Sequence, residues 1–163
     1  MATLSNASAT DKRTEDEKAI ETLLGKATVT YYAGEHQKTL ALLENITAIA
    51  PDIYEAWYNK GVILGNLDRH DEAIEAFDHA IKSKPDVYET WYQKGIVLCK
   101  LNRHAEALGA LDQAVNINPN DYKAWYNIGA SLDNLGRPKE AVKAYDKSTR
   151  LKLSNNSAEN SSD

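Results

Sequence analysis

Three histidines are the first side chains that suggest chemistry, because His36, His70 and His104 recur at intervals of 34 residues. Imidazole binds zinc, but a zinc site needs three or four ligand atoms about 2 Å from one ion. Side chains that recur at a long, fixed interval belong to successive structural units and do not converge on one point. We therefore interpret the three histidines as rings packed at turns, and expect neither a metal nor another cofactor.

The other reactive side chains also lack the neighbours that catalysis requires. Cys99 has no base close to it in the sequence, so we interpret it as a small apolar residue. His79 stands alone on a helical segment, and we expect it to be solvated. The sequence contains no glycine-rich phosphate loop, serine-centred elbow or paired zinc-binding histidines. We therefore predict no catalytic residue and no enzymatic activity.

The histidine interval belongs to a longer repeat. The stretch that begins at Tyr54 returns in similar form at Tyr88 and at Tyr122. Four further residue types keep the interval of 34 residues: Trp57, Trp91 and Trp125; Gly61, Gly95 and Gly129; Ala73, Ala107 and Ala141; Pro51, Pro85 and Pro119. A fixed period of this length indicates a stack of repeated units.

These residues resemble the tetratricopeptide repeat, a helix–turn–helix unit of 34 residues. Three units match it well (54–87, 88–121 and 122–153), and a degenerate unit (20–53) has Leu23 in place of tryptophan and Thr39 in place of alanine. The resemblance implies an all-α fold, a right-handed α-solenoid of about four units (an α-α superhelix). Positions below are counted from the first residue of each unit.

The physical pattern of one unit agrees with this resemblance. Apolar residues recur at helical spacing from about Ile53 to Leu67, and again from Ala73 to Ile81. Gly61 and Ala73 lack bulk and let the two helices approach closely, and Pro85 ends the second helix. Because neither helix can bury its apolar face alone, each unit must stack on the next.

The repeats define one domain, 14–153, between a disordered lead (1–13) and a disordered tail (154–163). A capping box at Thr14 and Glu17 predicts a first helix from about Glu15 to Ala33, and the last helix is expected over Pro138 to Arg150. The lead has no secretory signal, although a short organelle-targeting segment is an alternative. A single cysteine suits a reducing compartment, so we expect a cytoplasmic protein.

Net charge and hydropathy argue against two classes of binding partner, nucleic acid and the membrane. The net charge of −5 argues against binding to nucleic acid, which favours a basic stripe. No apolar run reaches the roughly 18 residues that a membrane helix needs. A protein or peptide is therefore the expected partner.

The family resemblance implies that the first helix of each unit lines a concave groove. The groove residues that this predicts are Glu55, Tyr58, Asn59, Val62, Glu89, Tyr92, Gln93, Ile96, Lys123, Tyr126 and Asn127. Tyrosine rings beside side-chain amides suit a bound peptide segment, and this predicts a non-enzymatic scaffold or adaptor. The alternative is that the tyrosines act as spacers between units.

One subfamily binds the acidic tails of heat-shock chaperones through a lysine-rich clamp. Aligned with that clamp, this chain keeps only Asn59 in one frame and Lys123 in the other, and the first frame places Glu89 where ligand carboxylates would lie. Since like charges repel, we consider a chaperone-tail receptor a less favoured function.

A second hypothesis is self-association through the last helix. Unit four has Ser148 where alanine is expected and Leu153 where proline is expected. The resemblance implies a further polar capping helix, but the polar segment that follows here has few apolar residues with which to form one. Val142, Tyr145 and Leu151 could then remain uncovered and form a homodimer contact. Alternatively, the lysines on this helix simply keep that face in water.

Overall fold

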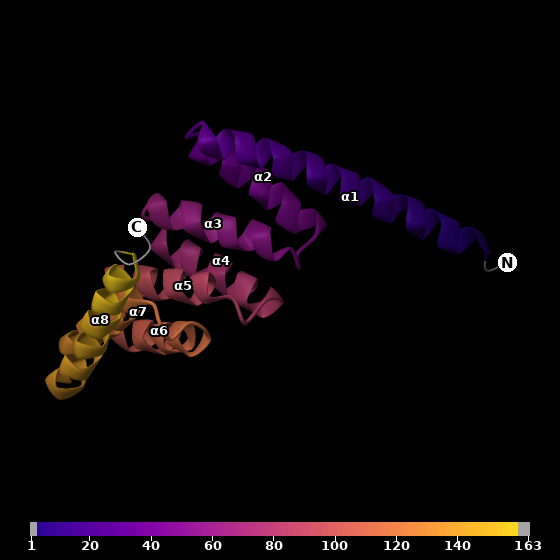
Figure 1. Cartoon of the computed structure of the whole chain (residues 1–163). Helices are drawn as coiled ribbons and strands as arrows, with labels where there is room; N and C mark the ends of the chain where they lie inside the picture. Colours follow the sequence, from indigo (N-terminus) through magenta and orange to yellow (C-terminus); the bar gives the residue numbers. More distant parts are fainter. Residues whose placement is uncertain (1–2, 160–163) are drawn as a thin grey trace.

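The computed structural model describes the backbone of residues 3–159 and the side chains of residues 14–156. The described backbone forms eight helices and no strand. Figure 1 shows that consecutive helices pair and that the pairs stack in chain order, so the fold is an all-α solenoid. The helices are α1 (Thr3–Tyr32), α2 (His36–Ile49), α3 (Tyr54–Asn66), α4 (His70–Ser83), α5 (Tyr88–Lys100), α6 (His104–Ile117), α7 (Tyr122–Asn134) and α8 (Pro138–Glu159).

The turn inside each pair has the same conformation in all four units. Its central residue, at position 15, has a positive φ of 57–74°, and the four residues are Gly34, Asp68, Asn102 and Gly136. The next amide donates to the carbonyl five residues earlier, as Arg69 does to Leu64 at 2.9 Å. Glycine, asparagine and aspartate are the residue types that best tolerate this backbone region, so local sequence determines the turn.

The turn between pairs depends on proline. Each of Pro51, Pro85 and Pro119 follows a residue with extended backbone, because proline disfavours a helical conformation in the residue before it. The proline carbonyl accepts a hydrogen bond from the next indole: Trp57 to Pro51 (2.7 Å), Trp91 to Pro85 (2.7 Å) and Trp125 to Pro119 (2.9 Å). The three tryptophans therefore have the same partner in successive units.

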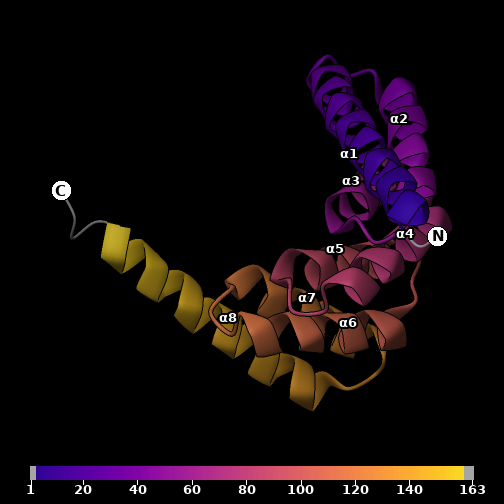
Figure 2. The same cartoon turned by 90° about the vertical axis from the view of Figure 1, so that its right-hand side faces the viewer.

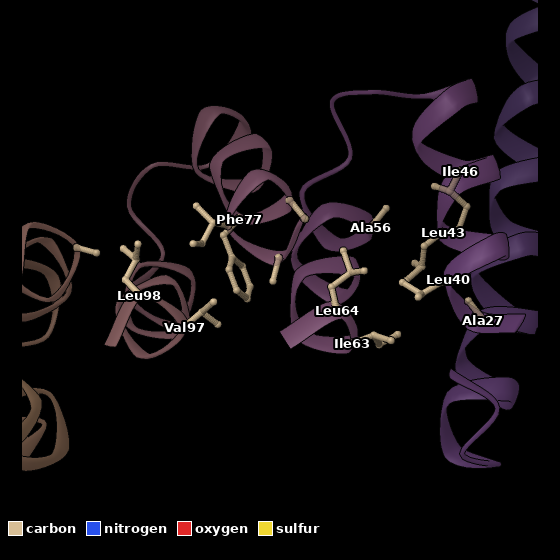
Figure 3. Packing of buried hydrophobic residues seen from close by; sticks show 14 of the residues in the cluster. Ala27, Leu40, Leu43, Ile46, Ala56, Ile63, Leu64, Phe77, Val97 and Leu98 are labelled. Atoms are coloured by element: carbon tan, nitrogen blue, oxygen red, sulfur yellow. The ribbon is translucent and has the colours of Figure 1, made fainter. Parts of the chain in front are cut away.

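The core runs along the stack, as Figure 3 shows for its first part. Phe77, Leu64 and Ile63 are almost fully buried between α3, α4 and the neighbouring pairs. A Cβ atom on Gly61 would lie 2.6 Å from Cε1 of Phe77, so only glycine permits this approach of α3 and α4. The predicted combination of small and large residues inside one unit is confirmed.

Both ends of the solenoid are more helical than the sequence predicts. α1 begins at Thr3 and not near Glu15, and α8 continues to Glu159 and not only to Arg150. The stop signal that ends α2, α4 and α6 is missing, because Leu153 stands where those units have proline. Helix therefore replaces most of the expected disordered lead and tail. Residues 1–2 and 160–163, the remainder of both segments, lie outside the described residues.

The expected boundary at 14–153 stays a prediction. None of the helices in the described backbone combines the length and hydropathy needed to cross a membrane.

Candidate functional site

The predicted groove residues lie on α3, α5 and α7, but the three tyrosines at position 5 differ in exposure. Tyr126 is 58% exposed, whereas Tyr58 and Tyr92 are half-buried. Tyr58 stacks on Tyr54 with ring centroids 5.7 Å apart, and Tyr92 stacks on Tyr88 at 5.6 Å. The tyrosines therefore do not form a uniform ladder, and only Tyr126 presents a largely open ring.

A pocket of about 590 Å³ lies beside Tyr126, between α5, α7 and α8. Four predicted groove residues line it together: Tyr92, Lys123, Tyr126 and Asn127. Its other lining residues are Tyr122 on α7 and, on α8, Ser148, Thr149, Lys152, Leu153 and Asn156. The structure thus brings the fourth-unit part of the predicted groove together with a wall from the last helix. Below, this is called the tyrosine pocket.

Hydrogen bonds hold the polar side of the tyrosine pocket in place. Asp121 caps α7 by accepting from the Lys123 amide (2.7 Å) and from the Tyr88 hydroxyl (2.6 Å). The Asn127 amide group donates to the Lys123 carbonyl (2.8 Å) and lies 3.4 Å from the Tyr92 hydroxyl. Burial, and then the charge of Asp121, raises the pKa of Tyr92. Its hydroxyl is therefore neutral at ordinary pH and can exchange hydrogen bonds with a ligand.

The charge of the tyrosine pocket is positive. Lys123 and Lys152 line it, and none of its described lining residues is acidic. Lys152 Nζ lies 5.8 Å from the centre of the Tyr122 ring. Tyr126 and Leu153, 58% and 62% exposed, provide apolar surface between the two lysines. The pocket can accept an apolar or aromatic group that carries a neighbouring negative charge.

The other predicted groove residues do not join this pocket. Glu55 forms an ion pair with Lys84 at 2.8 Å, and that hydrogen bond lowers the pKa of Glu55. Asn59 lines a separate hollow of about 200 Å³ with residues of α1 and α2. Glu89 is exposed, while three residues are half-buried along α3 and α5: Val62, Gln93 and Ile96.

The residues predicted for self-association also differ from one another. Val142 is 57% exposed and Leu151 is half-buried. Tyr145 is half-buried like Leu151, because its ring packs in the close approach of α7 and α8: a Cβ on Gly129 would lie 2.6 Å from it. Tyr145 occupies position 24, where Phe77 fills the same space in unit two.

The histidines and the cysteine have separate surroundings. His36, His70 and His104 are the first residues of α2, α4 and α6, and no group of three or more potential metal ligands occurs among the described residues. Cys99 is half-buried, with its Sγ 3.4 Å from Ser131 Oγ. His79 is not simply solvated: its ring stacks on Trp57 at 4.1 Å.

The residues of α8 that line the tyrosine pocket are not among those predicted from the sequence. Of these, Thr149, Lys152, Leu153 and Asn156 recur at intervals of three and four residues, which is typical of one helix face. That signal was present, but the polar composition after Leu153 favoured a disordered tail instead.

Comparison with known proteins agrees with the geometry. Family profiles described as tetratricopeptide repeat match residues 54–87 and 92–156, which together span more than half of the chain. A search of curated proteins finds no match.

Solved structures of MamA share the fold. A crystal structure of MamA superposes with a TM-score of 0.81 at 24% identity, over 85% of this chain and 81% of that one. A second structure, of MamA from Desulfovibrio magneticus RS-1 (residue 41 to the end), has a TM-score of 0.78 at 25% identity, over 82% of this chain and 75% of that one. The family matches, the repeated turns and this likeness agree in showing that the chain belongs to the tetratricopeptide repeat family, whose fold is a protein-interaction scaffold.

Proposed function

We propose that the chain is a non-enzymatic adaptor that binds a segment of a partner protein in the tyrosine pocket. The observation that carries this proposal is the exposure of Tyr126, which is 58% open beside two lysines and the α8 wall. A tyrosine ring gives contact area with little loss of conformational entropy, and exposed rings of this kind dominate many binding surfaces.

The chemistry of the pocket defines the segment that it fits. Tyr126 and Leu153 favour an apolar or aromatic side chain, and Lys123 and Lys152 favour an acidic residue beside it. The Asn127 side chain can pair with the peptide backbone, as amides do in extended-peptide complexes. The segment can continue over α5, where Gln93 offers a further amide.

A peptide library selected against the full chain tests this proposal. We expect the enriched peptides to combine an acidic residue with a neighbouring aromatic or branched apolar residue. Fluorescence polarisation of one such peptide should show affinity at least about tenfold weaker for Tyr126→Ala, since a central aromatic anchor is typically worth 2 kcal/mol or more. Tyr32→Ala is the matched control, because Tyr32 is 84% exposed but lies outside this pocket.

Equal peptide affinity of Tyr126→Ala and Tyr32→Ala would contradict the proposal that the peptide binds in the tyrosine pocket. Loss of affinity in Tyr126→Ala, with Tyr32→Ala unchanged, supports it. A further variant, Lys123→Glu, should weaken binding of acidic peptides and spare a neutral analogue, because it reverses one of the two pocket charges.

Self-association remains the second candidate function. Val142 favours it, because the corresponding Ile74 of unit two is only 7% exposed and belongs to a core cluster that includes Val97 and Leu98 of the following unit. A chaperone-tail receptor is disfavoured, since Glu55 and Glu89 place negative charge on the concave helices.

A further inference from the structure

Two of the three junctions inside the solenoid are joined by an ion pair between the same two positions of the unit, and the third has Ile128 in place of the lysine. Positions 3, 7 and 10 of a first helix face the unit before it. Lys60, at position 7, pairs with Glu44 of unit one at 3.6 Å, and Lys94 pairs in the same way with Asp78 of unit two. At position 3, Thr90 exchanges a hydrogen bond of 2.8 Å with Tyr54, which is position 1 of unit two.

In unit one these positions are open. Thr22, Lys26 and Val29 are exposed, and they line a hollow of about 680 Å³ along α1 and α2. Val29 is 70% exposed, whereas the residues at position 10 of the next two units, Ile63 and Val97, are at most 4% exposed. We call this surface the leading face. The leading face carries residue types like those that are buried at the internal junctions, but no preceding unit covers it in the described part of the chain.

At the other end, unit four presents the opposite half of a junction, which we call the trailing face. Asp146 stands at position 25, the position from which Glu44 and Asp78 bind a lysine of the next unit. Val142 stands at position 21 and is 57% exposed. Tyr122 stands at position 1, as Tyr54 does. In the described part of the chain no further helix pair packs on this face, and Lys152 of the same unit lies at its edge, with its Nζ 5.8 Å from the centre of the Tyr122 ring.

We propose that the trailing face of one copy binds the leading face of a second copy, head to tail, as if the solenoid continued. In that register Asp146 meets Lys26, Tyr122 meets Thr22, and the apolar centres at Val142 and Val29 are covered together. The first two pairs reproduce positions that are joined inside the chain, and the residues at positions 21 and 10 of neighbouring units, such as Ile74 and Val97, belong to one core cluster.

A fourth pair supports the same register. Inside the solenoid, Arg103 at position 16 binds Asp71 at position 18 of the unit before, at 3.3 Å. Across the proposed junction, position 16 holds Glu35 and position 18 holds Lys139. The positive and the negative side chain have exchanged places, so the two positions still attract each other. Glu35 also pairs with Lys38 of its own copy at 2.9 Å. Its carboxylate can therefore be shared between Lys38 and the Lys139 of the second copy.

The two long helices fit this arrangement. α1 and α8 are the longest helices of the chain, with 30 and 22 residues. The first helix of a unit runs antiparallel to the second helix of the unit before it. The extension of α8 in one copy and the N-terminal extension of α1 in the next would therefore lie on the same side of the stack. Figure 2 shows α8 projecting well beyond the helices that it packs on.

The contact joins two different faces, so it does not close on itself and each added copy leaves one face of each kind open. The inference does not rest on the proposed peptide function. Val29 and Val142 lie outside the tyrosine pocket, although Tyr122 belongs to both the pocket and the trailing face.

Two single variants test the register, because each should block one face only. Val29→Glu places a charge on the leading face, and Val142→Glu places one on the trailing face. Both residues are exposed in the single chain, so both variants should keep the wild-type fold and far-ultraviolet circular dichroism. Gly109→Glu is the matched control: Gly109 is exposed on α6, has open space around it and belongs to neither face.

Sedimentation velocity over a dilution series gives the readout. We expect wild type and Gly109→Glu to grow in mass with concentration without a fixed end point. Each blocked variant alone should associate at least about tenfold more weakly, because burial of an unpaired charge is strongly unfavourable. An equimolar mixture of the two should form a complex of two 18.1 kDa chains and stop there, since one intact face of each kind remains.

Three results would overturn the proposal. A wild-type chain that stays monomeric at all concentrations has no such contact. Self-association of Val142→Glu alone would show a symmetric contact of two leading faces, and self-association of Val29→Glu alone would show one of two trailing faces. Loss of peptide binding in Tyr126→Ala is a separate measurement, so failure of either proposal is visible without the other.

Discussion

The first and second units show how different sequences can form one helix pair. In unit two, Leu64 at position 11 and Ala73 at position 20 are buried against each other's helices. Unit one has threonine at both positions, and Thr39 Oγ1 donates to Thr30 Oγ1 at 2.9 Å with only 2% of Thr39 exposed. The buried Thr39 hydroxyl is tolerated because position 11 of the same unit is also a threonine, which accepts its hydrogen bond.

The close contact inside the pair differs in a similar way. Unit two combines Gly61 with Phe77, whose ring fills the space that a Cβ would need. Unit one combines Ala27 with the smaller Leu43, and both are buried, at 5% and 1%. The comparison teaches that the conserved property of a unit is the volume and polarity of facing pairs, and not the residue at any one position.

The largest expected effect is at Phe77. Phe77→Ala should lower the free energy of unfolding by about 3–5 kcal/mol, because it removes a fully buried ring from the middle of the stack. Leu43→Ala, in the end unit, should cost less, about 2–3 kcal/mol. Urea denaturation followed by circular dichroism measures both. A larger loss for Leu43→Ala would show that unit one is the more tightly packed of the two.

A smaller effect should appear when the small residue of unit two is enlarged. Gly61→Ala should cost about 1–3 kcal/mol, because the new Cβ overlaps the Phe77 ring. The control is Gly25→Ala, which meets no atom within 4 Å and should stabilise α1 by up to about 1 kcal/mol.

Adding Phe77→Leu to Gly61→Ala imitates unit one. The double variant should lose less than the two single losses added, since the smaller side chain relieves the overlap. Strict additivity would mean that the space opposite Gly61 does not decide the effect.

The smallest effect concerns the threonine pair of unit one. Thr39→Ala should cost about 1 kcal/mol, because it removes one buried hydrogen bond while Thr30 still donates to backbone carbonyls. Thr39→Ser keeps the hydroxyl and should recover most of that loss. A double-mutant cycle with Thr30→Ala measures the coupling energy between the two threonines. A value near zero would show that their hydrogen bond does not stabilise unit one.

Much of the fold was predictable because its signals lie within one 34-residue unit. The proline after α2, α4 and α6, the residue type at Gly34 or Asp68, and the small residue at Gly61 each act on neighbours a few residues away. The candidate site was only partly predictable. Lys123, Tyr126 and Asn127 are expected on one wall, but Lys152 and Leu153 lie beyond Arg150, where the last helix is expected to end, because the polar composition after Leu153 outweighs the helical spacing of this segment.

The sequence by itself determined the repeat, the helix pairs, their turns and the register of the units, because these depend on short-range backbone preferences and on apolar spacing. Only the tertiary structure decided which of three equivalent tyrosines is open. Tyr58 and Tyr92 are half-buried, whereas Tyr126 lies in the last unit and faces α8 and solvent. Exposure depends on which neighbour stands beside a residue, and identical positions in a finite stack do not have identical neighbours.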